Sequence, residues 1–225
     1  MSFYGELLAR TKTERDGFQS IPLIRAVMGG GGGVTRGMYL DFLTQAYHHV
    51  KHTFPLLASA AARTTDVSYQ KALLAYMNEE RGHDAWILDD IRAIGGDAEA
   101  VRDGRPGAAC ELMVAYSYYA IEHVSPFAML GSVHVLEGVS VALAHGAANA
   151  IQATLGVRQE EGFSYLRSHG TLDIQHVAFF RELVDGFAEE EIREIVVHSS
   201  KMFYKLYGDI FRELGSRHGV TAYAA

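Results

Sequence analysis

Apolar residues recur at the spacing of helical turns through almost the whole chain, and this periodicity is what most limits the fold. Between residues 35 and 61, for example, Leu40, Leu43, Tyr47 and Val50 fall on one helical face. No run of alternating β-branched residues stands between turn signals, so strands are not expected. The sequence therefore predicts an all-α fold whose amphipathic helices bury their apolar faces against one another.

We expect about seven helices in a single domain that spans residues 1–225. Thr35 is the predicted N-cap of the first long helix. The Gly95-Gly96 pair is expected to end the helix over about residues 67–94. Gly29 to Gly33 are consecutive glycines, which cannot hold a helix and predict a loop. The expected helices cover about residues 3–10, 18–28, 35–61, 67–94, 109–123, 126–154, 162–186 and 189–215.

Composition excludes several classes of protein. With 48% hydrophobic and 21% charged residues and no uninterrupted apolar run long enough to span a bilayer, the chain is not expected to be a membrane protein. A net charge of −7 without a Lys/Arg cluster disfavours nucleic acid as a partner. No secretory signal is visible, so we expect a cytoplasmic protein, and we expect it to be a homodimer. The lone Cys110 is expected to be a buried small side chain.

The most informative motif places three ionisable side chains on one helical face. His169, Asp173 and His176 stand at positions i, i+4 and i+7, within roughly 60° of arc. Apolar residues continue the same face at both ends. Burying such groups without partners costs roughly several kcal/mol each. The triplet therefore predicts either a metal site or a local His–Asp–His hydrogen-bond ladder.

A second expected helix carries a comparable anomaly. Glu80 and His83 form a Glu-x-x-His pair on a face that also holds Tyr76 and Ile87. Pairs of this kind project inward in carboxylate-bridged di-iron bundles, although an isolated pair also suits a helix surface. Glu79 lies four residues before His83 and is an alternative to Glu80.

The third anomaly is Glu137, which lies in one of the most apolar expected helices, where a buried carboxylate needs a cation. Mixed imidazole and carboxylate donors suit two iron ions, or manganese, whereas structural zinc favours thiolates and four ligands. One central site explains all three anomalies. The candidate metal ligands are Glu80, His83, Glu137, His169, Asp173 and His176.

Further histidines lie in the helix expected over residues 35–61. His49 and His52, or His48 and His52, have a spacing that could pair on a metal, but the polar flank of an amphipathic helix is the favoured interpretation. His134 lies three residues before Glu137 and is expected to be packed near the ligands or to support them.

At these residues the sequence resembles the heme-oxygenase-like di-iron oxidases, iron-containing redox enzymes related to the TenA and PqqC families. In that group a Glu and a His on one helix, a Glu on a later apolar helix and a His-x3-Asp-x2-His triplet supply the ligands. The resemblance covers about residues 35–210 and implies an irregular heme-oxygenase-like bundle. Some members place the first Glu two turns before the His, where this chain has Tyr76.

The resemblance implies a non-heme di-iron oxidase that uses O2 to oxidise a small organic substrate such as an amine, an amino acid or a fatty acid. The alternatives are a TenA-like thiaminase or hydrolase without metal and a PqqC-like cofactor-independent oxidase. A thiaminase of that kind needs an acid where this chain has Gln45-Ala46-Tyr47, and a cysteine in an aromatic-rich segment, unlike Cys110. A true heme oxygenase needs a histidine earlier than His48. A non-enzymatic helical module leaves the inward-facing polar groups unexplained.

Overall fold

The computed structural model describes residues 2–30, 33–157 and 162–221, without the side chains of residues 170–173. Within these ranges the chain forms helices and no strand, which confirms the all-α prediction. Short π- and 3-10 helices, Ala120–Val124 and Pro126–Ala128, lie between the α-helix that ends at Tyr119 and the one that begins at Met129. The α-helices are α1 Phe3–Arg10, α2 Lys12–Gln19, α3 Pro22–Met28, α4 Arg36–Val50, α5 Thr53–Arg63, α6 Val67–Glu80, α7 His83–Ala93, α8 Ala98–Asp103, α9 Ala108–Tyr119, α10 Met129–Leu155, α11 Ser164–Asp185 and α12 Glu190–Arg217.

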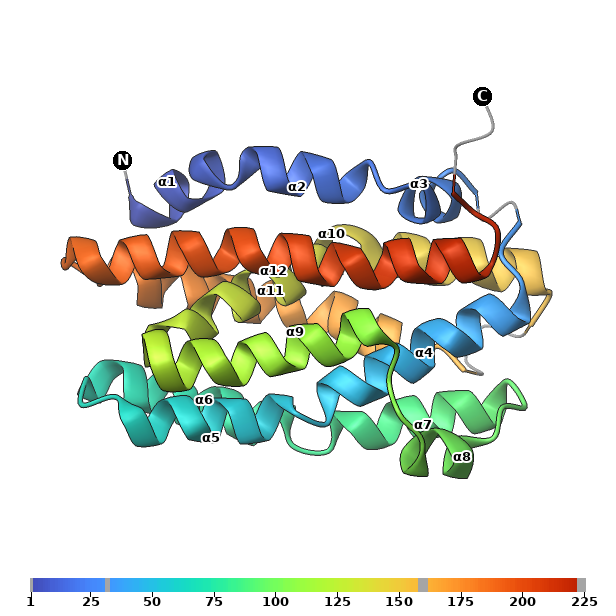
Figure 1. Cartoon of the computed structure of the whole chain (residues 1–225), viewed down its shortest axis with the longest axis horizontal. Helices are drawn as coiled ribbons and strands as arrows, with labels where there is room; N and C mark the ends of the chain where they lie inside the picture. The colour runs from blue at the N-terminus through green and yellow to red at the C-terminus, as the bar shows by residue number, and fades with distance from the viewer. Residues whose placement is uncertain (1, 31–32, 158–161, 222–225) are drawn as a thin grey trace.

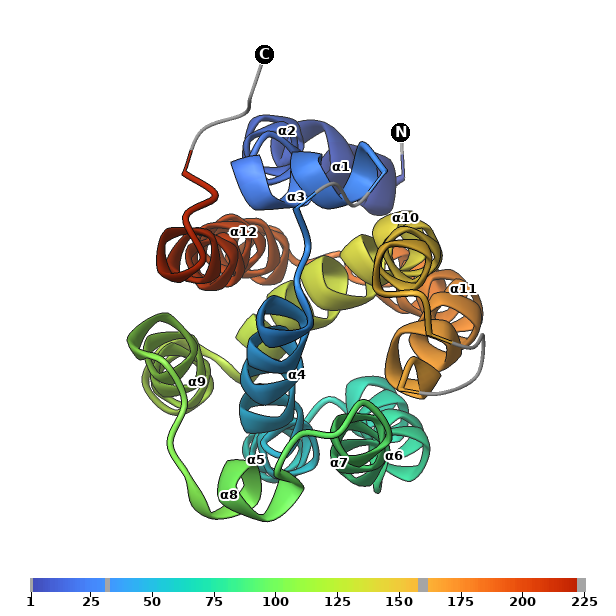
Figure 2. The ribbon, with the colours of Figure 1, turned by 90° about the vertical axis from the view of Figure 1, so that its right-hand side faces the viewer.

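Most helices run lengthwise along the long axis of the molecule, with α1 to α3 laid along α12 (Figure 1). Seen from one end, α4 lies near the middle, with α9 and α12 on one side and α6, α7, α10 and α11 on the other (Figure 2). Helix α11 contacts α6, α7 and α10. Ionisable residues on these four helices can therefore meet in one place.

Two helix ends lie where the sequence predicts them. The Thr35 hydroxyl accepts a hydrogen bond from the Met38 amide at 3.1 Å and caps α4. Helix α7 ends at Ala93, just before Gly95, whose φ of +72° suits glycine far better than other residues.

The expected number of about seven helices is too low, in part because two of the long ones are each divided. The helix expected over 35–61 is α4 and α5, which are separated at Lys51-His52, and the one expected over 67–94 is α6 and α7. The second break falls at Gly82, where a φ of +92° interrupts the helix. The short helices α2 and α8 also lie outside the expected set.

Helix α10 is the apolar centre of the fold. The segment Pro126–Leu155 is long and apolar enough to cross a membrane, but 56% of its most apolar window is buried inside the molecule, as in the core helix of a globular domain. The helix approaches α12 closely. The Ser199 hydroxyl donates to the Ala128 carbonyl at 2.6 Å, and a Cβ added at Gly131 would lie 2.6 Å from the backbone carbon of Ser199.

The start of α11 is fixed by a buried carboxylate from α7. Asp90 is 3% exposed, and its oxygens accept hydrogen bonds from the Ser164 amide at 2.9 Å, the Ser164 hydroxyl at 2.8 Å and the Tyr165 amide at 2.8 Å. A carboxylate at this position satisfies amide groups that the first turn of a helix leaves unpaired. Asp90 therefore sets the position of the helix that carries the His-x3-Asp-x2-His triplet.

We expect Asp90→Ala to lower the free energy of unfolding by about 1–3 kcal/mol, because it leaves buried amides without an acceptor. Asp89→Ala is the matched control, since the neighbouring Asp89 side chain is 71% exposed and pairs only with Arg92 at the surface. Chemical denaturation of both variants measures the difference. Equal losses would mean that the carboxylate does not order the start of α11.

Candidate metal centre

Three of the predicted ligands come together between α6, α7 and α11. Glu80 is the last residue of α6, His83 is the first of α7, and His169 lies on α11. One donor atom from each lies within 4.8 Å of the others. Although the helix breaks between them, the His83 Nδ1 atom remains 3.2 Å from a carboxylate oxygen of Glu80. The spacing of the motif therefore brings the pair together across two helices rather than along one.

The His169 ring is held in one tautomer by the backbone of its own helix. Its Nδ1 atom lies 3.0 Å from the Tyr165 carbonyl oxygen. A carbonyl only accepts hydrogen bonds, so Nδ1 carries the proton and Nε2 presents its lone pair. Metal-binding histidines are commonly oriented in this way. The His83 and His169 rings meet nearly at right angles, with their centroids 4.9 Å apart.

The Glu80 carboxylate is charged despite its burial, with only 12% of its side chain exposed. Burial alone would raise the pKa of this carboxyl, but the close contact with His83 and the charges of His83, His169 and His176 hold the pKa below its ordinary value. A carboxylate that is ionised at neutral pH is ready to bind a cation.

A neighbouring group joins α6, α10 and α11. The His176 Nδ1 atom lies 3.5 Å from a carboxylate oxygen of Glu137, and its Nε2 atom lies 2.7 Å from one of Glu79. The Glu79 side chain is 55% exposed, whereas that of Glu137 is 12% exposed, so the Nδ1 atom faces the inner carboxylate. The sequence left Glu79 and Glu80 as alternatives, and the structure places them against different histidines.

Asp173, the sixth predicted ligand, lies in α11 between His169 and His176, and its side chain is outside the described residues. Its role as a ligand stays a prediction from the helical spacing.

The donors open onto a narrow apolar cavity of about 180 Å³. Its wall follows α10 from Met129 to Ile151, about 33 Å of helix at about 1.5 Å per residue. Its charged or imidazole-bearing lining residues are His49, Glu80, Glu137 and His169, and the described lining contains no Lys or Arg. Such a cavity suits a molecule that is apolar over most of its length.

The sequence favoured a polar helix flank for His48, His49 and His52, but the structure buries His48 and His49 and leaves His52, which follows α4, half-buried. His48 is 1% exposed, and its Nδ1 atom lies 3.1 Å from Lys51 Nζ, while the His52 Nδ1 atom lies 3.0 Å from the Tyr118 hydroxyl. His49 is 8% exposed and lines the cavity. Burial, with smaller effects from His169 and His52, lowers the pKa of His49 to about 3, so its ring is neutral.

His134 is packed, as expected. Its ring stacks on Phe180 with centroids 5.7 Å apart and meets Tyr4 and Tyr204 edge-on. Burial, with a smaller effect from Arg15, lowers the pKa of His134 to about 4. A neutral ring in this aromatic layer supports the packing of α10 against its neighbours.

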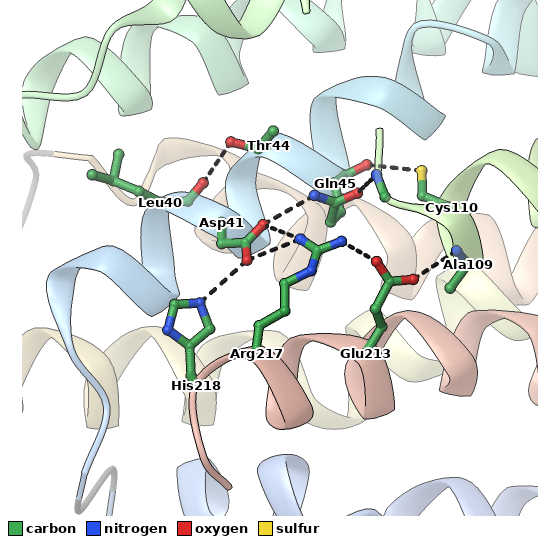
Figure 3. Close-up of polar contacts among 10 residues, drawn as sticks. Leu40, Asp41, Thr44, Gln45, Ala109, Cys110, Glu213, Arg217 and His218 are labelled. Atoms are coloured by element: carbon green, nitrogen blue, oxygen red, sulfur yellow. Dashed lines mark hydrogen bonds and ion pairs between the residues drawn. The ribbon is translucent and has the colours of Figure 1, made fainter. Parts of the chain in front are cut away.

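Cys110 is buried, as predicted, and lies beside a polar network that joins the start of α9 to α4 and α12 (Figure 3). Its thiol donates to the Gln45 carbonyl at 3.5 Å. Burial, and then the Glu213 carboxylate, raise the pKa of the thiol to about 12. In the same network Arg217 binds both oxygens of Asp41, at 2.9 and 3.1 Å. A thiol in this setting is a poor nucleophile.

The donor set fits iron. Two imidazoles and a carboxylate within one small volume, with a histidine held between two further carboxylates next to them, offer the mixed nitrogen and oxygen ligands that iron or manganese takes. Two other residues that line this cavity, His49 and Tyr76, were not among the predicted ligands. Two signs pointed to Tyr76: it lies one turn before Glu80, and some members of the resembled group have a glutamate at that position.

Comparison with known proteins places this geometry in context. Residues 40–208 match the model of a family described as iron-containing redox enzyme. A domain of unknown function with a heme oxygenase-like fold from Shewanella denitrificans is 24% identical, with a TM-score of 0.86 over 96% of this chain and 94% of that one. No curated protein matches the sequence.

More distant structures share the fold. A TenA homolog from Pseudomonas syringae pv. tomato is 10% identical, with a TM-score of 0.80 over 95% of this chain and 93% of the other. The heme oxygenase from Leptospira interrogans is 17% identical, with a TM-score of 0.74 over 95% of this chain and all of the other. The predicted heme-oxygenase-like, TenA-like architecture is thereby confirmed.

Proposed function

Because the chain belongs to the family of iron-containing redox enzymes, we propose that it is a non-heme di-iron oxidase that uses O2 to oxidise a small organic substrate. The observation that carries the proposal is the cluster of Glu80, His83 and His169, whose donor atoms lie within 4.8 Å of one another. The adjacent contact between His176 and Glu137 supports a second ion next to the first.

In this proposal six residues hold the two ions: Glu80, His83, Glu137, His169, Asp173 and His176. Bound as ferrous ions, the metals would supply electrons for the reduction of O2. The protein orients the donors. The Tyr165 carbonyl orients the His169 ring, and Glu79 contacts the outer nitrogen of His176, as a carboxylate commonly does for a metal-binding histidine. The apolar wall keeps bulk water from the reacting atoms.

The cavity supports a substrate with a sizeable apolar part. Its wall is apolar along α10, and the described lining offers no cation to an amino acid's carboxylate. Burial of an unpaired carboxylate is costly, so a free amino acid fits this wall poorly. We therefore favour an alkyl amine whose ammonium group lies near Glu80 and Glu137, because the carboxylate of a fatty acid would meet the same cost as that of an amino acid.

Anaerobic addition of ferrous iron, followed by exposure to O2, tests the proposal. We expect about two irons bound per chain, as a di-iron carboxylate site requires, and O2 consumption that depends on that iron. Iron analysis and an oxygen electrode give the two quantities. The control is Cys110→Ser, which should change neither, because the thiol lies outside the donor cluster.

Other outcomes would favour the alternative functions. O2 consumption without bound iron would favour a cofactor-independent oxidase. Thiamine hydrolysis that Cys110→Ser abolishes, in a protein that binds no iron, would favour the thiaminase. Either result would remove the di-iron assignment while leaving the fold unchanged.

A further inference from the structure

Tyr76 has a buried hydroxyl beside the donor cluster. The residue is 2% exposed, and its hydroxyl oxygen has no hydrogen-bond partner among the described residues. Leaving a buried hydroxyl unpaired costs about 1–3 kcal/mol. A phenylalanine would fill the same space without that cost. The hydroxyl is therefore explained best if a ligand of the protein binds to it.

The surroundings of this hydroxyl are those of the proposed iron site. Tyr76 lines the cavity together with Glu80, Glu137 and His169. Its ring meets the His176 ring edge-on, with centroids 6.0 Å apart, and lies 5.3 Å from the Phe179 ring. Burial, and then the Glu137 carboxylate, raise the pKa of the phenol well above its ordinary value. Without a metal the hydroxyl therefore keeps its proton.

Other fully buried tyrosines in the chain are paired. The Tyr69 hydroxyl, two turns earlier in α6, donates to the Pro126 carbonyl at 2.9 Å. The Tyr39 hydroxyl donates to the Gly162 carbonyl at 2.7 Å. Tyr39 and Tyr69 thus satisfy their hydroxyls with backbone carbonyls, and Tyr76 departs from that pattern beside the group of possible cation ligands found among the described residues.

We propose that the Tyr76 oxygen is an additional ligand, which binds ferric iron as a phenolate. The proposal rests on the iron site put forward above. On coordination the O–H bond breaks, an iron–oxygen bond forms, and one proton is released to solvent with no change in the number of electrons. A phenolate is a hard anionic oxygen donor, like the carboxylates around it, and suits the ferric ion.

Ferric phenolates absorb visible light through charge transfer from oxygen to iron, which provides a readout that is independent of turnover. Ferrous iron is added to the whole protein without air and is then oxidised by O2. We expect a broad visible band together with tyrosinate vibrations in its resonance Raman spectrum. Tyr76→Phe should lose both while retaining bound iron. Tyr69→Phe, the matched control on the same helix, should keep both.

The outcomes separate this inference from the proposed function. Ferric iron bound in full without the band, or a band with tyrosinate vibrations that persists in Tyr76→Phe, would overturn the phenolate and leave the iron site standing. A wild-type protein that binds no iron would overturn both. If Tyr76→Phe does not fold, as judged by circular dichroism, the Raman spectrum of Tyr69→Phe decides, because a band without tyrosinate vibrations there contradicts the proposal.

Discussion

His169→Ala is expected to abolish tight iron binding. The substitution removes the imidazole that the Tyr165 carbonyl orients, and it breaks the group formed with Glu80 and His83. Loss of residues that merely orient a ligand already weakens metal affinity by about 10- to 100-fold, so loss of a ligand should cost more than about 100-fold. Competition with a chelator of known affinity measures the change.

Asp173→Ala is expected to lose iron to a similar extent, because its helical spacing places it between His169 and His176. The control is His218→Ala. That imidazole lies 3.2 Å from an Asp41 oxygen, in the network at the end of α12 (Figure 3), and contributes nothing to the donor cluster. Equal losses of iron in all three variants would show that binding does not occur at the proposed site.

Gly131→Ala is expected to lower the free energy of unfolding by about 1–3 kcal/mol or more, as overpacking of a close helix contact does. The added Cβ would lie 2.6 Å from the Ser199 backbone carbon, so α10 and α12 would have to move apart. The Ser199 hydroxyl bond to the Ala128 carbonyl would be lost with that movement. Urea denaturation of the metal-free protein measures the change.

The matched control is Gly138→Ala in the same helix. A Cβ at Gly138 meets nothing within 4 Å, so the higher helix propensity of alanine should stabilise the protein by up to about 1 kcal/mol. If the free energy of unfolding falls in Gly131→Ala and rises in Gly138→Ala, close packing at Gly131 is the cause of the loss. Similar effects at both positions would contradict that explanation.

The sequence predicts those features of the fold that local chemistry controls. The cap at Thr35 and the helix end before Gly95 follow from side-chain and backbone preferences within a few residues. The break at Lys51-His52 also has a local signal, because Pro55 has no backbone N–H to donate to the carbonyl of residue 51 and its ring crowds that carbonyl; the helix expected over 35–61 ignored this proline. Gly82 was a signal for the other break, but an isolated glycine is also common inside a helix.

The candidate site likewise has features that the sequence predicts and features that it does not. His169 and His176 could be assigned to one face because helical periodicity fixes their relation. The contacts of His176 with Glu79 and Glu137 depend on how α6, α10 and α11 pack, which no local pattern specifies. The burial of His48 and His49 likewise follows from the central position of α4 and not from its own amphipathic pattern.

The interruption at Gly82 has a mechanical consequence. Glu80 ends α6 and His83 begins α7, so the two side chains belong to separate helices and not to one continuous helix. A small change in the angle between α6 and α7 would alter the distance between the Glu80 carboxylate and the His83 imidazole without breaking a backbone hydrogen bond inside either helix. In the proposed metal site, Glu80 and His83 could therefore bind ions of different radius or charge.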